Sequence, residues 1–195
     1  DSSLGGKNGV NLPDGKNLVG SFHQPELVLI DFGFLKTLPP REIISGLGEI
    51  LKYSYLNQKI SFPVFEPKRF DHKKMLATIQ KLTPHCVKLK MELVQKDELD
   101  QKGIRQVLNL GHTFGHVLET YTQYKQFKHG EAVIWGLKFA ALVSYLKEKM
   151  SFEDFREVMN LANKLKVPPL PRVLDPEKCF KLALKDKKSE NNQIK

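Results

Sequence analysis

The chain has 195 residues, of which 41% are hydrophobic, so it is long enough for one real hydrophobic core. Its 31 basic and 22 acidic residues give a formal net charge of +9, but the lysines are scattered and accompany no recognition-helix, zinc-finger or aromatic stacking motif, which argues against a nucleic-acid partner. The two cysteines, Cys86 and Cys179, lack CxxC spacing, which excludes a disulfide scaffold and fits a reducing cytoplasm.

The first elements that the sequence predicts are a loop and a short strand. The opening DSSLGGKNGVN and the following PDGKN combine glycines, which permit a close backbone approach, with Lys7 and Lys16, whose ammonium groups suit an anion. The Walker pattern is absent, and taken alone the segment predicts loop and turn over residues 1–17. Residues 26–31, ELVLID, have the apolar bias of a short buried strand.

The next element is a helix predicted over residues 39–55. Two prolines suit its first turn, where the missing N–H is not needed. Ser45, Glu49 and Lys52 then share one face at i, i+4 and i+7. A surface ion pair would explain Glu49 and Lys52, but the two glycines of SGLGE are poor choices for an exposed helix. Glu49 could instead supply the carboxylate that completes a zinc site.

Helices are predicted over most of the remaining chain. Pro84 divides one long helical pattern in two, and Ser151 and Asp175 are expected N-caps. The apolar run at 132–146 has Lys138 inside it, is too short to cross a bilayer and predicts a buried core helix. The fold is therefore expected to be mainly α. The predicted helices cover residues 71–82, 84–98, 104–122, 129–149, 151–165 and 176–186.

The helix predicted over residues 104–122 carries a polar stripe. Arg105, Asn109, His112 and His116 fall at i, i+4, i+7 and i+11, so all four would share one face. Apolar residues cover the rest of this helix, and a solvated face would more naturally be rich in Lys and Glu. The glycines of GHTFG each cost about 1 kcal/mol in a helix interior, which suggests that another backbone or a ligand comes close. We interpret the stripe as the wall of a buried polar cavity that holds a metal.

The histidine spacing is compatible with more than one arrangement. His112 and His116, four residues apart on a helix, could present two imidazoles to one divalent ion. His129, which begins the next predicted helix and is followed by Gly130 and Glu131, could close on the same point. A structural or surface HxxxH pair explains the spacing about as well as a metal site does, so the residues alone leave both readings open.

Six blocks of sequence, in order, resemble the 3-dehydroquinate synthase family across essentially the whole chain. They are DSSLGGKNGVN, KNLVGSFHQPELVLID, FLKTLPPREIISGLGEILKY, LKMELVQKDE, RQVLNLGHTFGHVLE and KHGEAVIWGL. The resemblance implies the helical C-terminal domain of an α/β + α enzyme. Residues 1–38 would be a loop and strand segment that completes the NAD-binding domain and the cleft, and residues 39–195 the α-helical domain that binds metal and substrate. The rest of the NAD-binding domain is expected to be absent from this chain.

The resemblance also implies a reaction. Enzymes of this family are lyases of the shikimate pathway that convert 3-deoxy-D-arabino-heptulosonate 7-phosphate to 3-dehydroquinate and phosphate, with NAD and one divalent metal, Zn²⁺ or Co²⁺. NAD takes a hydride transiently, phosphate leaves by elimination, and after the reduction the sugar ring opens and closes again as a carbocycle. A homodimer in the cytoplasm, with a small sugar phosphate as substrate and no membrane partner, is implied by the same resemblance.

Residue roles are implied at the positions that match the family. The implied metal ligands are Glu49, His112 and His129, which moves His116 from the metal to the substrate. The implied catalytic and substrate-contacting residues are Asn17, Lys52, Lys90, Arg105, Asn109, His116 and Lys187. The implied cofactor-contacting residues are Asp1, Lys7, Lys16, Phe34, Leu35, Lys36 and Thr37, of which Asp1 and Lys7 also match substrate contacts.

Three alternatives remain beside this reading. A sister sugar-phosphate cyclase would keep the metal and NAD sites but alter the residues that face the substrate carboxylate. A non-catalytic metal- or anion-binding helical module would have to explain why a ligand triad and cavity-facing Lys and Arg coexist. A metal-dependent alcohol dehydrogenase of the same broad architecture would release free NADH.

Overall fold

The fold is mainly α-helical, as the sequence predicts. A computed structural model describes residues 2–12, 15–57, 60–63, 71–185, 189–190 and 193–194. The α-helices are α1 (Pro40–Leu56), α2 (His72–Lys96), α3 (His112–Tyr121), α4 (His129–Leu146), α5 (Phe152–Ala162) and α6 (Pro176–Lys185). The 3-10 helices are η1 (Ser2–Gly5), η2 (Phe32–Thr37) and η3 (Ile104–Asn109). The strands are β1 (Lys7–Leu12), β2 (Gly15–Phe22), β3 (Ser189–Glu190) and β4 (Gln193–Ile194).

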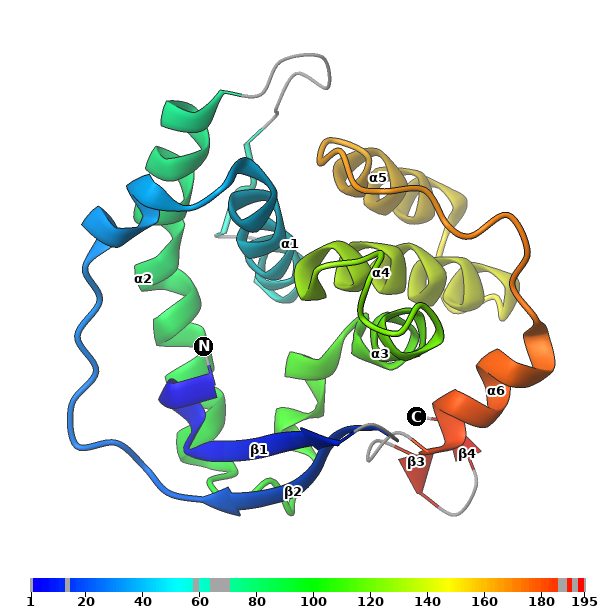
Figure 1. Ribbon diagram of the computed structural model, residues 1–195, viewed down its shortest axis with the longest axis horizontal. Helices are drawn as coiled ribbons and strands as arrows, with labels where there is room; N and C mark the ends of the chain where they lie inside the picture. The colour runs from blue at the N-terminus through cyan, green and yellow to red at the C-terminus, as the bar shows by residue number, and fades with distance from the viewer. Residues whose placement is uncertain are drawn as a thin grey trace.

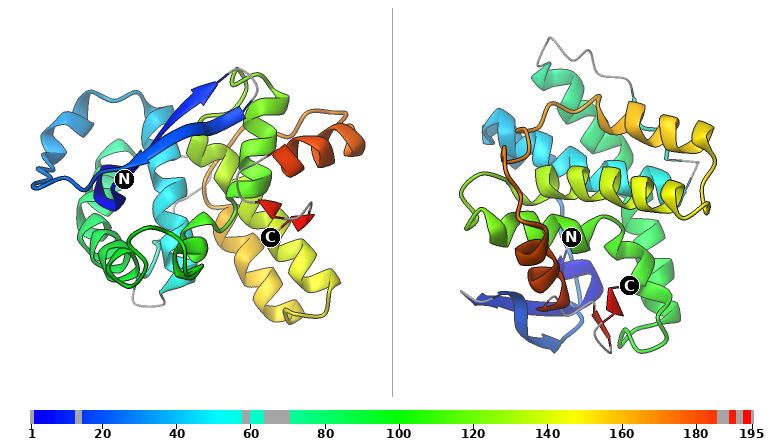
Figure 2. Two further views of the ribbon diagram at one scale, coloured as in Figure 1. Left: turned by 90° about the horizontal axis from the view of Figure 1, so that it is seen from below. Right: turned by 90° about the vertical axis from the view of Figure 1, so that its right-hand side faces the viewer.

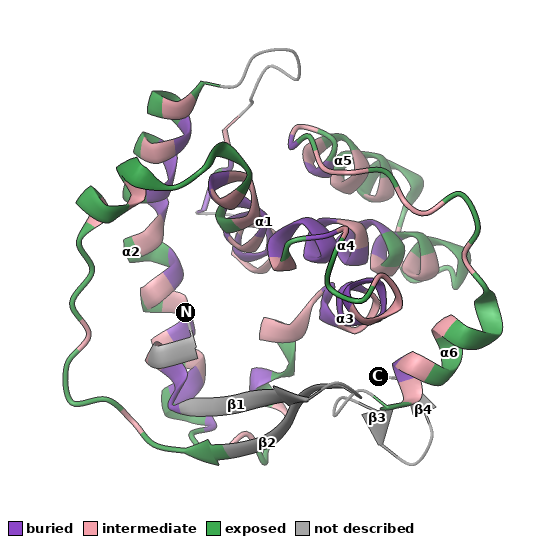
Figure 3. Cartoon of the chain, viewed as in Figure 1, coloured by how far each residue is buried: buried purple, intermediate pink, exposed green. Residues whose placement is uncertain are grey.

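The main core lies where α1 meets its neighbours. α1 packs against both α2 and α4, and α4 also packs against α3 and α5 (Figure 1). Buried residues gather on α1, α3 and α4 where these helices face one another, whereas α5 and α6 are mostly partly or fully exposed (Figure 3). The centre of the core is formed by Ile43, Leu47, Leu51, Val133 and Ile134. Within the described part of the chain, no helix combines the length and the hydropathy needed to cross a bilayer.

The smaller elements lie at one end of the molecule. β1 and β2 form an antiparallel hairpin, and η1 just before it packs against α2. β3 and β4 form a second antiparallel pair that packs against α6, and α6 itself packs against α3. Figure 1 and the right-hand view of Figure 2 place the hairpin and α6 at the end away from α5. The hairpin corrects the prediction that residues 1–17 are only loop and turn.

The long helix α2 corrects the prediction of two helices separated at Pro84. α2 runs without a break from His72 to Lys96 with Pro84 inside it. A proline removes one N–H and disfavours a helix interior, but the buried face of α2 continues on both sides of Pro84 and packs on α1. Helical spacing is kept throughout that face, so burial against α1 outweighs the tendency of Pro84 to end a helix. Its residues are Met75, Thr78, Ile79, Leu82, Cys86, Lys90 and Val94.

The single helix predicted over residues 104–122 is wrong. Residues 104–109 form the 3-10 helix η3, and α3 begins at His112 after Gly111, whose φ is +77°. A left-handed residue ends one helix and redirects the chain. The stripe of four polar residues therefore lies on two differently oriented segments. Arg105 and Asn109 belong to η3, and His112 and His116 belong to α3.

The buried strand predicted at residues 26–31 is also wrong. The segment has no regular hydrogen bonding, and it exposes 73% of Leu27 and 86% of Leu29. An apolar extended segment needs a neighbouring strand and a covering layer before it can be a buried strand. The described residues provide neither a neighbouring strand nor a covering layer for this segment. Its sequence pattern is typical of a strand, but it does not form one in this part of the chain.

The C-terminal helices begin where their caps predict. The Ser151 side chain accepts a hydrogen bond from the Asp154 N–H, and Asp175 Oδ1 accepts from the N–H groups of Glu177 and Lys178. These side-chain acceptors satisfy first-turn donors that have no partner inside the helix. The helix ends are less well predicted, because α4 stops at Leu146 and α5 at Ala162, before the predicted ends at residues 149 and 165.

Two glycines let the backbones of α1 and α4 touch. A Cβ on Gly48 of α1 would lie 2.4 Å from the carbonyl oxygen of Gly130, and a Cβ on Gly130 would lie even closer to that of Ser45. The Ser45 hydroxyl accepts the Gly130 N–H at 3.0 Å, which fixes the crossing. A similar glycine contact joins α3 to α4, since a Cβ on Gly136 would overlap the Gly111 carbonyl oxygen. The prediction that another backbone or a ligand approaches Gly111 and Gly115 is confirmed, because a Cβ at either position would meet the backbone of α4.

Two alanine substitutions in α1 test this crossing. Gly48→Ala should lower the free energy of unfolding by about 1–3 kcal/mol, because the added methyl meets backbone rather than a flexible side chain. Gly46→Ala, two residues earlier in the same helix, places its methyl in open space and should raise stability by about 1 kcal/mol through helix propensity. Urea unfolding of both variants measures the difference, and equal effects would contradict the close crossing.

Candidate metal and anion site

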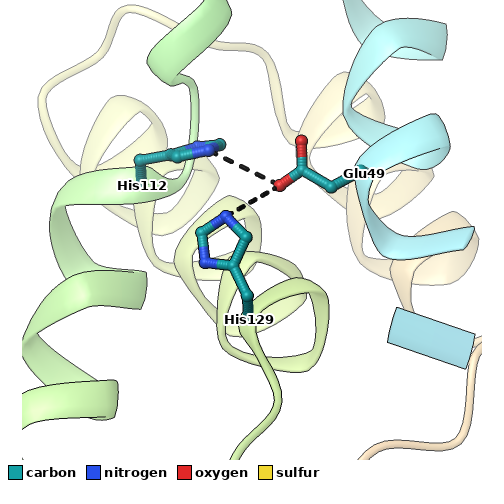
Figure 4. A group of neighbouring side chains, drawn as sticks. All are labelled: Glu49, His112 and His129. Carbon is teal, nitrogen blue, oxygen red and sulfur yellow. Dashed lines mark ion pairs between the residues drawn. The ribbon is translucent and has the colours of Figure 1, made fainter. Parts of the chain in front are cut away.

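Three side chains from three helices converge at the end of the α1–α4 crossing. Glu49 comes from α1, His112 is the first residue of α3, and His129 is the first residue of α4. Glu49 Oε1 lies 3.5 Å from His112 Nε2 and 3.2 Å from His129 Nε2 (Figure 4). The glycine contacts position all three, because they set how closely α1, α3 and α4 approach.

The donor atoms of these residues suit a divalent cation. Donors about 2.0–2.2 Å from a tetrahedral ion lie roughly 3.3–3.6 Å apart, close to both separations at Glu49. Glu49 Oε1 is buried, and no group in the described part of the chain gives it a well-formed hydrogen bond. The His112 Nδ1 atom lies 3.1 Å from the Leu110 carbonyl oxygen, so its N–H points there and its Nε2 lone pair faces Glu49. Two imidazoles and one carboxylate therefore fit a zinc-type site with an open position.

Charge holds Glu49 ionised. Burial alone would raise the pKa of Glu49, but the imidazole of His129 and the ammonium of Lys52 hold that pKa well below its ordinary value. Lys52 Nζ lies 2.8 Å from Glu49 Oε2 and is 2% exposed, so this pair is not the surface ion pair that the sequence left open. The two oxygens of Glu49 thus have different surroundings. Oε2 faces Lys52, and Oε1 faces the two imidazoles.

A second group of possible ligands shares His129. Donor atoms of His116, Glu119 and His129 lie within 4.8 Å of one another. His129 Nδ1 is 3.1 Å from Glu119 Oε2, and the rings of His116 and His129 are stacked at 5.8 Å. Neither of the two groups found among the described residues contains both His112 and His116. The HxxxH pair is therefore not brought together on one ion in the way that its spacing alone suggests.

A cluster of buried cations adjoins Glu49. Lys52, Lys90 and Arg105 are 2%, 7% and 5% exposed, and they come from α1, α2 and η3. Arg105 Nη1 donates to the Glu98 carbonyl at 2.7 Å, and Nη2 donates to the Gly5 carbonyl at 3.1 Å. Among the described charges that act on Lys90, the two cations Lys52 and Arg105 outnumber the one carboxylate, Glu49. An excess of this kind away from water favours an anionic ligand.

The pKa of Lys90 reflects this excess charge. Burial, followed by repulsion from Lys52 and Arg105, lowers the pKa of Lys90 from its ordinary value of 10.5 to about 8. Gly5 lies over this lysine, since a Cβ there would be 3.2 Å from Lys90 Cε and 2.7 Å from Arg105 Nη2. The N-terminal segment thus covers the cluster at a position where a larger side chain would have to displace the Arg105 guanidinium.

Asp97 organises the loop that carries Arg105. This carboxylate is 2% exposed, and it accepts the N–H groups of Gln101, Lys102, Ile104 and Arg105 at 2.8–3.4 Å. Burial alone would raise the pKa of Asp97, but these N–H donors lower it. The loop from α2 to η3 is therefore fixed by one side chain, and Arg105 is fixed with it.

The other predicted residues lie in varied positions. Asn109 is partly buried in η3, next to the turn into α3. Phe34 to Thr37 lie in η2, where Phe34 is 76% exposed and Leu35 packs against the core. Lys7, Lys16 and Asn17 belong to the strands of the hairpin. Asp1 and Lys187 lie outside the described residues.

Sequence reasoning missed Glu119 and Asp97. Glu119 is 4% exposed and contacts His129. A signal existed, because Glu119 follows His116 by three residues and so lies on the same face of α3. Asp97 gave no comparable signal, since its acceptor role depends on the left-handed Gly103 and on the path of the following loop.

The sequence matches two family descriptions. Residues 46–189 match "3-dehydroquinate synthase C-terminal", and residues 1–45 match "3-dehydroquinate synthase N-terminal". The chain belongs to the 3-dehydroquinate synthase family. It is 42% identical over 199 residues to the 3-dehydroquinate synthase of Natranaerobius thermophilus and 42% identical over 198 residues to that of Campylobacter hominis. All of the chain is covered in both cases, together with 54% and 56% of the relatives, so the chain spans about half their length.

Solved structures of related cyclases share the fold. A 2-deoxy-scyllo-inosose synthase complexed with carbaglucose-6-phosphate, NAD⁺ and Co²⁺ is 28% identical, with a TM-score of 0.78 over 96% of this chain and 52% of that one. A 2-epi-5-epi-valiolone synthase from Streptomyces hygroscopicus is 24% identical, with a TM-score of 0.70 over 94% and 51% of the two chains. The second likeness concerns the fold alone.

Metal analysis of two variants separates the possible ligand sets. His112→Ala should abolish stoichiometric Zn²⁺ because it removes one of three donors that meet at Glu49 Oε1. His116→Ala should retain one equivalent. Elemental analysis after dialysis against a weak chelator measures both. If His112→Ala keeps its metal and His116→Ala loses it, the HxxxH pair is the true ligand set.

Sulfate binding tests the cation cluster through Lys90. Sulfate stays a dianion from pH 6 to 10 and should bind the ammonium form of Lys90, raising the melting temperature by mass action. Because the pKa of Lys90 is about 8 in the folded chain, this gain should be fully present at pH 7 and should decline as the pH rises above 8.

Two lysine variants complete that test. Lys90→Met should remove most of the sulfate response. Lys138→Met is the matched control, because Lys138 is 8% exposed against 7% for Lys90 and burial also lowers its pKa, but it lies over Trp135 on α4. An equal loss in both variants, or a sulfate response that is independent of pH, would contradict the cluster as the anion site.

Proposed function

We propose that this chain carries the metal- and substrate-binding part of a 3-dehydroquinate synthase, acting on 3-deoxy-D-arabino-heptulosonate 7-phosphate. The observation that carries the proposal is the meeting of Glu49, His112 and His129 at ligand spacing directly beside the cations Lys52, Lys90 and Arg105. A substrate with hydroxyls, a phosphate and a carboxylate needs both features. The identities of 38–42% to enzymes named 3-dehydroquinate synthase support the same reaction.

The three proposed ligands would hold one Zn²⁺ or Co²⁺. When bound, this ion supplies a Lewis acid that lowers the cost of removing a hydroxyl proton. Lys52 keeps Glu49 ionised, and the Leu110 carbonyl orients the His112 imidazole. The structure of the related 2-deoxy-scyllo-inosose synthase with Co²⁺ supports a metal in this fold.

The cations would bind and orient the substrate. Arg105 already donates to two main-chain carbonyls, so its guanidinium is held in one orientation. Its other N–H groups can donate hydrogen bonds to an anion. Lys52 and Lys90 add compact ammonium groups. His116, on the same helix as His112 and stacked on His129, is proposed to exchange protons with the substrate. Asn17, Asn109 and Lys187 are proposed as further substrate contacts.

The N-terminal residues are proposed to complete an NAD site. NAD would supply the hydride acceptor for the transient oxidation. We assign Asp1, Lys7, Lys16 and Phe34 to Thr37 to it, and residues 1–38 to a segment that joins the NAD-binding domain, while residues 39–195 form the helical domain. The exposed apolar side chains of residues 26–31 support this division, since they would be covered by a neighbouring sheet. The match of residues 1–45 to the N-terminal family description supports it as well.

Assembly and location are proposed by family likeness. We propose a cytoplasmic homodimer. The free Cys86 and Cys179 are compatible with a reducing compartment. Exposed Phe139, Leu142 and Leu146 on α4 provide an apolar surface that a subunit contact could cover.

Phosphate release tests the proposed reaction. The metal-loaded chain alone, given NAD and the heptulosonate phosphate, should release no phosphate, because holding the hydride acceptor against one carbon can contribute roughly 7–11 kcal/mol of the barrier. Adding the separately expressed N-terminal half of the Natranaerobius relative should restore release, and His112→Ala should abolish it again.

The sugar chosen as the control separates the related enzymes. A heptulose phosphate without the carboxylate should be a poor substrate of the reconstituted enzyme. Efficient cyclisation of that sugar would identify a sister sugar-phosphate cyclase, and release of free NADH would identify a dehydrogenase. Phosphate release by the chain alone would contradict the division of the NAD site.

A further inference from the structure

Glu119 is a buried carboxylate outside both the metal triad and the cation cluster. It lies in the last turns of α3 and is 4% exposed, among the apolar neighbours Val117 and Leu118. A buried carboxylate is costly unless it is paired. Its Oε2 atom lies 3.1 Å from His129 Nδ1, the ring nitrogen that points away from Glu49. The one imidazole therefore lies between two carboxylates, Glu119 on one side and Glu49 on the other.

We propose that Glu119 is a positioning residue that fixes the tautomer and ring orientation of His129 for metal binding. This inference rests on the proposed function, because it assumes that His129 is a ligand. It adds a residue that acts on the metal through another side chain. Glu119 itself would not touch the ion.

The hydrogen-bond inventory supports this role. A neutral imidazole carries one N–H and one lone pair. The carboxylate of Glu119 accepts the N–H at Nδ1, which leaves the lone pair on Nε2 directed at Glu49 Oε1, 3.2 Å away. A metal ion between Nε2 and Oε1 would take a lone pair from each atom, and Glu49 Oε1 has no well-formed hydrogen bond from the described residues that would compete with it.

The two histidine ligands differ in the strength of their support. His112 Nδ1 donates to a neutral main-chain carbonyl, that of Leu110, whereas His129 Nδ1 donates to a charged carboxylate. Charge-assisted bonds are roughly twice as strong as neutral ones. An outer carboxylate also makes the imidazole a more basic ligand. His129 begins its helix and is the more exposed of the two rings, at 36% against 11%, so it has more need of an external anchor.

The backbone of Glu119 anchors the same connection. Its carbonyl accepts the Tyr124 N–H at 2.7 Å, in a turn where Gln123 and Tyr124 both have positive φ. Its side chain then bonds to His129 at the other end of this connection. Glu119 therefore holds both the start and the end of the segment that leads from α3 to the third ligand.

The variants Glu119→Leu and Glu119→Gln test the proposal in the full chain. Leucine removes the acceptor but fills the buried volume, and glutamine keeps a weaker, neutral acceptor. Titrating metal-free protein with Co²⁺ alone should show affinity about 10- to 100-fold weaker for Glu119→Leu. Glu119→Gln should recover part of that loss. Both should still bind one equivalent, and the Co²⁺ absorption bands should shift in Glu119→Leu because the geometry at His129 changes.

Tyr55→Phe is the matched control. The Tyr55 hydroxyl donates to the Val158 carbonyl at 3.0 Å, so this variant removes a partly buried hydrogen bond between α1 and α5, at a residue outside the metal triad and the cation cluster. Tyr55→Phe should lower the melting temperature of the metal-free chain while leaving the Co²⁺ affinity and bands unchanged. An equal change in both proteins would show that Glu119 acts only through general stability, and would overturn the proposal. If Glu119→Leu fails to fold, the comparison between Glu119→Gln and wild type decides.

The remaining outcomes are distinct. Wild-type affinity and bands in Glu119→Leu would overturn the role of Glu119 and leave the metal site intact. Two equivalents of Co²⁺ in wild type, with one lost in both Glu119→Leu and His116→Ala, would show that Glu119 is itself a ligand in a second site, and would also overturn the proposal. Absence of Co²⁺ binding in wild type would refute the metal site, and with it the proposed function.

Discussion

The close contact of α4 with α1 and α3 is the constraint on which the site depends. Gly48 and Gly130 bring α1 and α4 together, and Gly111 and Gly136 do the same for α3 and α4. Glycine inside a helix costs about 1 kcal/mol relative to alanine, so Gly48 and Gly136 lower the intrinsic stability of their helices while they allow the close approach. In return, the first residues of α3 and α4 and the middle of α1 approach closely enough for His112, His129 and Glu49 to meet. The proposed metal site therefore depends first on backbone packing and only then on the choice of side chains.

Glu49 links the two electrostatic parts of the site. One of its oxygens faces the imidazoles and the other faces Lys52, which in turn lies near Lys90 and Arg105. A cation at the imidazoles would withdraw charge from Glu49 and weaken its compensation of Lys52. The excess positive charge of the cluster would then grow, which favours an anion still more strongly. Metal binding and anion binding are therefore expected to reinforce each other through this carboxylate.

The sequence predicted the elements with a long, uniform apolar face and missed those decided by tertiary contact. α1 and α4 follow from their spacing and their first residues. The unbroken α2 does not, because burial against α1 outweighs Pro84. The break at Gly111 could not be predicted from periodicity, because the polar and apolar residues of η3 and α3 follow the spacing of a single continuous helix. At the site, the glycines signalled close approach, whereas the relation of Glu119 to His129 depends on how α3 turns into α4 and has no local signature.

The N-terminal segment is part of the anion site rather than an appendage to it. Gly5 lies against Lys90 and Arg105, and its carbonyl accepts an N–H of the Arg105 guanidinium. Any movement of this segment changes how the cations are covered and how Arg105 is oriented. The same segment continues into the hairpin and then into the exposed apolar residues 26–31, whose side chains require a neighbour that the described residues do not provide. A domain that covers residues 26–31 would contact the same N-terminal segment that carries Gly5, so covering these residues and placing Gly5 against the cations are expected to be coupled.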